Sequence, residues 1–100
     1  MGFVEVAKVS GLKPGSSKVV NVSGKELALF NVDGQFFVTD NACVHRNGPL
    51  GEGTLDGDVV TCPWHGWRYN VRTGVSPVNP AAKVQPYKVK VEGDKVLVEV

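Results

Sequence analysis

The chain has 100 residues, of which 42% are hydrophobic and 21% are charged. This length suits a single globular domain over 1–100 and excludes a multidomain enzyme, because a second core would need more chain. Eleven Lys and Arg side chains against ten Asp and Glu leave a formal net charge of +1. We therefore expect neither nucleic acid nor an anionic membrane as a partner, since no overall charge attracts the chain to them.

The sequence predicts a cytoplasmic protein. No strictly apolar run approaches the roughly 20 residues that a membrane-spanning helix needs. Residues 1–6 contain no basic side chain and no long apolar stretch, so we expect no secretory signal peptide.

In the N-terminal half, β-branched and aromatic residues alternate with polar ones, which predicts strands rather than helices. The expected strands cover 3–9, 18–22, 27–32 and 36–39. The dipeptide Asp33-Gly34 between the last two is typical of a type I′ hairpin turn, because both of its central positions need positive φ.

The segment 41–76 differs from the rest of the chain because glycines recur along it. It also contains Pro49, and Pro63 directly follows its second cysteine. We expect loops to hold most of this segment. A β framework with one glycine-rich excursion is typical of a binding site built on loops and positioned by a rigid scaffold.

The C-terminal residues predict a further hairpin, with its turn at Gly93-Asp94. In the first arm, 87–92, Tyr and Val alternate with Lys and Glu. In the second arm, 96–100, Val residues occupy one face and Leu97 lies on the other, so we expect the pair to lie well inside a sheet.

All cysteines and histidines of the chain fall in two boxes, Cys43-Val44-His45 and Cys62-Pro63-Trp64-His65. Thiolate and imidazole both ligate metals, so two such pairs on facing loops could surround one metal centre. A tetrahedral zinc site is one alternative, although zinc fingers usually pair Cys with Cys and His with His. A Cys43–Cys62 disulfide is another, but it leaves the histidines unexplained and implies an oxidising compartment.

The two boxes resemble those of the Rieske family, whose Cys-x-His and Cys-x-x-His sequences hold a [2Fe–2S] cluster. The flanking sequences Gly48-Pro49-Leu50, Leu55-Asp56-Gly57 and Arg72-Thr73-Gly74 also look like family features. The resemblance implies an all-β fold, a small antiparallel sandwich or barrel-like domain. A cluster-binding subdomain at about 41–76 would be inserted between its strands.

The resemblance also implies the ligands of one [2Fe–2S] cluster per chain. Cys43 and Cys62 would bind the inner iron, and His45 and His65 the outer iron. Neutral imidazoles in place of two thiolates remove negative charge, so the reduction potential rises above that of an all-cysteine ferredoxin. No histidine remains for a second, mononuclear iron, and no nucleotide fingerprint is visible. We therefore expect an electron-transfer protein rather than an enzyme.

Several neighbours of the boxes are expected to form the surroundings of the cluster. Backbone N–H groups near Gly48, Gly51 and Gly66 would approach the sulfides closely, and the two tryptophans would cover the cluster from water. Tyr69 stands where the family's Tyr can hydrogen-bond a cysteine sulfur, or it is a packed aromatic. Trp67 replaces the Ser of high-potential members, so we expect a potential near about −150 mV, the low end of the Rieske range. The expected surroundings are Gly48, Pro49, Trp64, Gly66, Trp67 and Tyr69.

All three arginines, Arg46, Arg68 and Arg72, lie in the segment 41–76, whereas every lysine lies outside it. Arginine is enriched at protein interfaces because its planar head group pairs bidentately with carboxylates. Arg46 and Arg68 are therefore candidates for docking a partner. The alternative is that the arginines pair internally with acidic residues of the same segment.

The predicted function is that of a ferredoxin which carries single electrons from a flavin-dependent reductase to a terminal oxygenase. A small electron-transfer subunit of a larger oxidoreductase is the first alternative, because nitrite reductase small subunits share this fold. A zinc-stabilised binding module without redox function is the second.

Overall fold

The computed structural model describes residues 2–22, 24–41, 49–63, 66–77 and 81–99. Over these residues the fold is all-β, as predicted, with ten strands, two short 3-10 turns and no α-helix. Neither turn is long and apolar enough to cross a membrane. The strands are β1 (Phe3–Lys8), β2 (Ser17–Val22), β3 (Lys25–Val32), β4 (Gln35–Asp40), β5 (Thr54–Asp56), β6 (Val59–Thr61), β7 (Arg68–Asn70), β8 (Pro86–Tyr87), β9 (Val89–Glu92) and β10 (Lys95–Glu99), and the turns are η1 (Val9–Gly11) and η2 (Leu50–Glu52).

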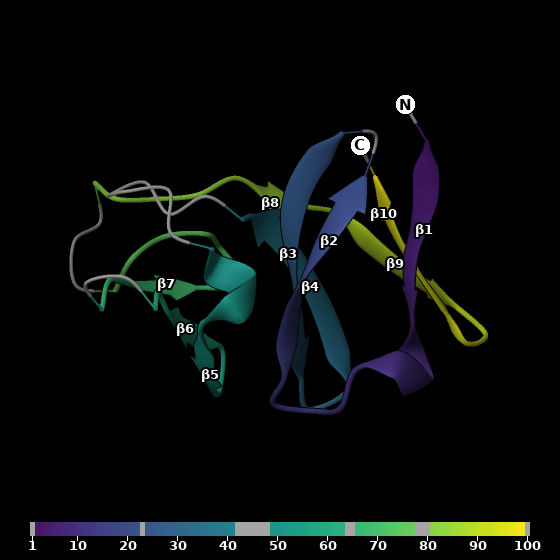
Figure 1. Ribbon diagram of the computed structural model, residues 1–100, viewed down its shortest axis with the longest axis horizontal. Helices are drawn as coiled ribbons and strands as arrows, with labels where there is room; N and C mark the ends of the chain where they lie inside the picture. The colour runs from purple at the N-terminus through teal and green to yellow at the C-terminus, as the bar shows by residue number, and fades with distance from the viewer. Residues whose placement is uncertain (1, 23, 42–48, 64–65, 78–80, 100) are drawn as a thin grey trace.

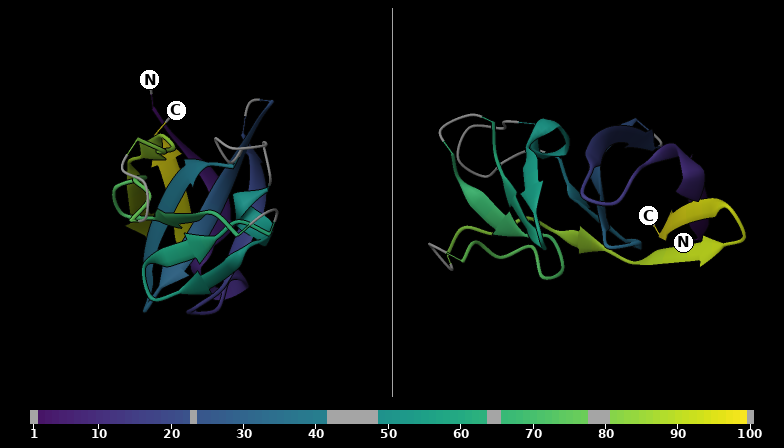
Figure 2. Two further views of the ribbon diagram at one scale, coloured as in Figure 1. Left: turned by 90° about the vertical axis from the view of Figure 1, so that its left-hand side faces the viewer. Right: turned by 90° about the horizontal axis from the view of Figure 1, so that it is seen from below.

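Three antiparallel sheets follow one another along the longest axis of the molecule (Figures 1 and 2). The middle sheet has the strand order β2-β3-β4-β8. On one side of it lies the sheet β1-β10-β9, and on the other lie η2 and the small sheet β5-β6-β7. The middle sheet therefore lies between the sheet formed by the first and last strands and the small sheet formed by residues of the segment 41–76.

The middle strand β3 is buried on both faces, because side chains alternate across a strand and each face meets a different core. Leu27 and Leu29 join what we call the scaffold core, whereas Ala28, Phe30 and Val32 join the site core on the opposite face. The remaining members of the scaffold core are Leu12, Val20, Val22, Phe36, Val38, Val96 and Val98, and those of the site core are Leu50, Val60, Cys62, Tyr69, Val71, Ala82 and Val84.

The predicted hairpin turn between β3 and β4 is confirmed. Val32 pairs with Gln35 across the turn, and Asp33 and Gly34 have φ of 51° and 91°. Positive φ at both central positions is the type I′ geometry, whose twist matches that of the flanking strands.

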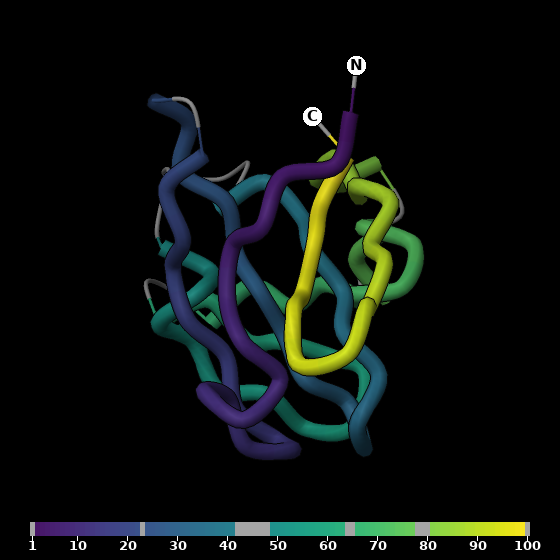
Figure 3. Tube along the Cα trace, turned by 90° about the vertical axis from the view of Figure 1, so that its right-hand side faces the viewer, coloured from purple at the N-terminus to yellow at the C-terminus, as the bar shows by residue number. Residues whose placement is uncertain are grey.

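The C-terminal hairpin is also present, but its two arms differ in burial. Figure 3 shows β10 between β1 and β9, so β10 is a central strand and β9 is an edge. Val96 and Val98 of β10 are fully buried, whereas Val91 of β9 is 48% exposed. The expectation that both arms lie well inside a sheet is therefore wrong for β9, because among the described strands only β10 pairs with it.

The segment predicted to consist mostly of loops contains a three-stranded sheet. Cross-strand pairs place Leu55, Val60 and Tyr69 in one row, and this row faces the site core. Each strand has only three residues, which is too short for an alternating pattern to be visible in the sequence.

The scaffold core predicts a large effect of Leu29→Ala. Leu29 is fully buried, and removing a buried leucine side chain should lower the free energy of unfolding by about 2–5 kcal/mol. Leu97→Ala is the matched control, since Leu97 is only partly buried and belongs to neither core. Urea denaturation of both variants measures the difference, and equal losses would contradict this account of the core.

Candidate metal centre

The second box occupies the connection between β6 and β7. Cys62 follows the last residue of β6 directly, and Thr61 pairs with Arg68 at the end of the ladder. The backbone N–H of Cys62 donates to the carbonyl of Trp67 at 2.6 Å. This bond closes the connection 62–67 at its base. Gly66 within it has φ of 72°, a conformation in which a glycine avoids the strain of a side chain.

The first box follows β4, and the segment that contains it is also closed at its base. Asn41 accepts two hydrogen bonds from the start of η2. The N–H of Leu50 donates to its main-chain oxygen at 2.8 Å, and the N–H of Gly51 donates to its side-chain Oδ1 at 2.9 Å. Asn41 and Leu50, which stand on either side of the first box in the sequence, are therefore joined directly.

The bases of the two segments pack together in the site core. Leu50, which ends the first segment, and Tyr69, which follows the second, are both fully buried. Cys62 is 2% exposed and belongs to the same core. The structure therefore brings the residues that flank the two boxes into one apolar environment, although they are separated in the sequence. A thiol held in such a place is a suitable soft donor to iron.

Twelve residues were proposed above as cluster ligands, cluster surroundings or docking residues, and six of them lie among the described residues. Pro49 precedes η2 and is partly buried, and Trp67 packs against the site core with part of its side chain exposed. Within the described part of the chain, no three Cys, His, Asp or Glu residues gather as a metal site. The described six are Pro49, Cys62, Gly66, Trp67, Arg68 and Tyr69; Cys43, His45, Arg46, Gly48, Trp64 and His65 lie outside the described residues.

The N–H of Gly51 has a partner within the fold. It donates to Asn41 Oδ1, so Gly51 itself is not one of the sulfide donors expected near the glycines. Gly51 lacks a side chain for another reason, because a Cβ would lie 2.7 Å from the backbone of Lys18 and Val19 on β2. The close approach is to the middle sheet.

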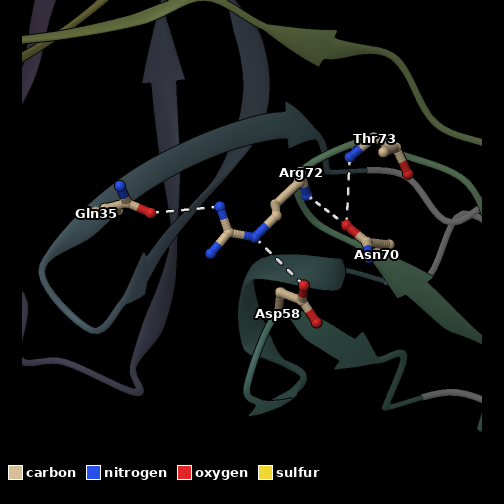
Figure 4. Close-up of polar contacts among 5 residues, drawn as sticks. All are labelled: Gln35, Asp58, Asn70, Arg72 and Thr73. Atoms are coloured by element: carbon tan, nitrogen blue, oxygen red, sulfur yellow. Dashed lines mark hydrogen bonds and ion pairs between the residues drawn. The ribbon is translucent and has the colours of Figure 1, made fainter.

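The two described arginines differ in their contacts. The Arg72 Nε lies 3.3 Å from Asp58 Oδ2, and its Nη1 lies 3.3 Å from Gln35 Oε1 (Figure 4). Its guanidinium also covers the ring of Phe37 at 4.8 Å. Internal pairing with an acidic residue of the segment is therefore confirmed for Arg72. Arg68 is exposed, and no ion pair among the described residues involves it.

A polar network that the sequence did not reveal anchors the end of β4. The Tyr87 hydroxyl donates to Asp40 Oδ1 at 2.7 Å and accepts from Lys25 Nζ at 2.9 Å. The backbone N–H of Asp40 donates to the carbonyl of Gln85 at 2.9 Å. Asp40 precedes Asn41, so the network holds β3, β4 and β8 together at the base of the first box.

The network changes the ionisation of two of its members. Burial raises the pKa of the Tyr87 hydroxyl above its ordinary value of 10.0, and the hydrogen bond to Asp40 adds to this rise. The hydrogen bond with Tyr87 raises the pKa of Lys25 above 10.5. In the folded protein both groups therefore hold their protons more tightly than in the unfolded chain.

Three antiparallel sheets, with Cys62 buried directly after β6 and with β4 leading in the sequence into the other Cys/His box, are typical of a small iron–sulfur electron-transfer domain. The chain belongs to the Rieske [2Fe–2S] domain family, whose model matches residues 2–98. The cofactor of this family is a Rieske-type [2Fe–2S] cluster, and the zinc alternative is not supported.

Several relatives are named as ferredoxin subunits or components of dioxygenase systems. The biphenyl dioxygenase ferredoxin subunit of Pseudomonas sp. (strain KKS102) is 40% identical over 99% of this chain and 93% of its own. In a solved complex of reduced oxygenase and oxidized ferredoxin in carbazole 1,9a-dioxygenase, one chain is 38% identical, with a TM-score of 0.88 over 96% of this chain and 91% of that chain. This chain is accordingly a one-electron carrier of the Rieske ferredoxin type.

The chain is similar to a nitrite reductase small subunit in its fold only. A solved chain named as the small subunit of an NADPH nitrite reductase matches with a TM-score of 0.86 and covers all of both chains, at 17% identity. The expectation that this group shares the fold is confirmed, and at this identity nothing further follows from it.

The network around Tyr87 predicts how stability depends on pH. Because both groups bind their protons more tightly in the folded protein than in the unfolded chain, they add to the free energy of unfolding while they are protonated. This contribution is lost as the pH rises through about 10 and beyond. The urea midpoint of the wild-type protein should therefore fall over this range. Tyr87→Phe removes the linked group, so its midpoint should start lower and fall less steeply. Equal slopes in the two proteins would contradict the role of the network.

Proposed function

We propose that this chain is the ferredoxin component of an oxygenase system and passes single electrons from a flavin-dependent reductase to a terminal oxygenase. The observation that carries the proposal is that residues next to the two boxes share one apolar core. Leu50 follows the first box in the sequence, Cys62 begins the second and Tyr69 follows it, and all three are buried in the site core. The named roles of the relatives support the same partners.

The proposed ligands are Cys43 and Cys62 on the inner iron and His45 and His65 on the outer iron. Cys62 is the one ligand among the described residues, and its surroundings fit the role. Its backbone N–H is already bonded to Trp67, and its burial excludes water from the sulfur. When bound, the [2Fe–2S] cluster supplies reversible one-electron chemistry.

The residues around Cys62 would adjust the cluster to this task. Tyr69 is fully buried in the same core, so its hydroxyl is held in a fixed position. Trp67 has no hydroxyl to donate to a sulfide, which supports a potential at the low end of the Rieske range. Trp67 would also shield the site from water, because its ring packs against the site core.

The remaining assignments follow from this role. We propose that the chain has no catalytic activity of its own and forms one domain over 1–100, with the cluster-binding subdomain at about 41–76. A cytoplasmic location fits thiolate ligands, because the cytosol keeps cysteines reduced.

The ligand assignment predicts the effect of Cys62→Ser. A serine oxygen is a harder donor than thiolate and holds iron–sulfur centres poorly, so the purified variant should lose its visible absorption and its bound iron. Thr61→Ser is the control, since Thr61 lies next to Cys62 on β6 and should keep both. Absorption spectra and iron analysis measure the outcome. A Cys62→Ser protein with an unchanged spectrum would refute the assignment.

Arg68 supports a docking surface beside the second box. It begins β7 next to Trp67 and borders a groove of about 370 Å³ on the outer face of the small sheet. The groove is lined by Asp56, Val59, Thr61, Arg68 and Pro77. Since its guanidinium forms no ion pair with the described residues, Arg68 can pair with a carboxylate of a partner. We propose the same role for Arg46, which lies outside the described residues.

Arg68→Ala and Arg72→Ala form a matched pair for testing this surface. Arg68→Ala should slow electron transfer to a biphenyl dioxygenase oxygenase component by up to about fivefold at low salt, as expected for loss of an exposed ion pair. The difference from wild type should shrink as salt is added. Arg72→Ala should leave the rate unchanged, because Arg72 pairs within the chain. Stopped-flow kinetics measure both, and equal rates for the two variants would contradict the docking role of Arg68.

A further inference from the structure

The short turn η2 is held from two sides by groups that are not candidate ligands. On the first side stands Asn41, which is 6% exposed. Its two oxygens accept the N–H groups of Leu50 and Gly51 at 2.8 and 2.9 Å. One side chain and one peptide group therefore join the end of β4 to the beginning of η2.

On the second side stands β2. The Ser17 hydroxyl lies 3.1 Å from the carbonyl oxygen of Gly51 and 3.3 Å from that of Gly53, and it can donate its proton to either. The missing side chain of Gly51 lets its backbone lie against that of Lys18 and Val19. As a result η2 is fixed to the middle sheet rather than to the small sheet alone.

The residues that make these contacts stand before and after the first box in the sequence. Cys43 and His45 lie within 42–49, and Asn41 binds the residues that follow that segment. The start of the segment is independently held, because Asp40 is tied to Gln85 and Tyr87. A segment whose two ends are fixed loses less conformational entropy when its side chains bind a metal centre.

We propose that Asn41 is a positioning residue for the cluster, and that Asn41 and Ser17 together fix η2, the turn that follows the first box in the sequence, to the middle sheet. The inference rests on the proposed ligand assignment, since it concerns the segment that carries Cys43 and His45. Asn41 does not touch the iron in this account. It acts through its hydrogen bonds to Leu50 and Gly51.

The residue type matters because Gly51 is buried. With alanine at position 41, the N–H of Gly51 loses its acceptor in a place that water does not reach, which is costly. The chain can relieve this cost by opening the segment locally, because the scaffold core lies on the opposite face of the middle sheet. Local opening would loosen the ligands while the framework stays folded.

Asn31 provides a matched control. It is 3% exposed, its Oδ1 accepts the N–H of Gly34 at 2.8 Å, and its Nδ2 donates to the carbonyl of Leu12 at 2.8 Å. It therefore closes a turn just as Asn41 does, but at the β3–β4 turn and against the scaffold. Asn31→Ala should lower overall stability without opening the first-box segment.

The experiment compares wild type, Asn41→Ala and Asn31→Ala by two readouts at a temperature well below unfolding. Hydrogen exchange followed by mass spectrometry measures the peptide 41–53, and bleaching of the visible absorption by EDTA measures release of the cluster. In Asn41→Ala both should be about tenfold faster than in wild type, the change expected for one buried N–H without an acceptor. Exchange in 95–99 should stay unchanged.

Two conservative variants separate hydrogen bonding from packing. Asn41→Asp keeps an oxygen acceptor for Gly51 and should recover most of the slow exchange. Ser17→Ala should speed exchange in 41–53 less than Asn41→Ala does, and Ser17→Thr, which keeps the hydroxyl on a strand, should restore it. These smaller changes keep the test informative if Asn41→Ala does not fold.

The proposal is overturned if Asn41→Ala exchanges and bleaches like wild type, or if Asn31→Ala affects both readouts equally. Failure of the proposed function has a different signature. In that case wild-type protein carries no Rieske cluster and bleaching has nothing to report, while exchange in 41–53 still decides whether Asn41 holds the segment.

Discussion

The burial of β3 on both faces is the constraint on which the rest of the structure depends. Its alternating side chains divide the apolar interior into a scaffold core, closed by β1 and β10, and a site core, closed by η2 and the small sheet. Because the two cores lie on opposite faces of the middle sheet, the scaffold core contains none of the described residues that flank the two boxes. This arrangement suits a carrier whose metal centre must sit near the surface on a rigid base.

Hydrogen bonds hold the described residues on either side of each box together. One is the backbone bond from Cys62 to Trp67, and the other is the pair of bonds from η2 to Asn41. The Asp40–Tyr87–Lys25 network fixes the strand from which the first box departs. Electron transfer benefits from such closure, because a centre held in one geometry in both oxidation states has little to rearrange.

The sequence alone was sufficient to predict the long strands and the family. It was not sufficient to predict the short strands and the hydrogen bonds that hold the residues next to the two boxes. The long strands carry visible alternation, and Asp33-Gly34 is one of the few dipeptides that favour a type I′ turn. All four soft donors fall in two matched boxes, which makes the cofactor recognisable. By contrast, three-residue strands such as β5 are too short to show an alternation of apolar and polar residues. Asn41 resembles any polar residue at a strand end, and the edge position of β9 depends on which strands pair, which is not a local property.

The central claim is that the chain holds a cluster with mixed cysteine and histidine ligands. Low-temperature EPR of the dithionite-reduced protein, recorded after its visible spectrum, tests it most directly. The account predicts a red-brown protein and a rhombic signal whose average g lies below that of all-cysteine ferredoxins, because histidine ligation changes the electronic structure of one iron. A colourless, EPR-silent protein that contains zinc would contradict it.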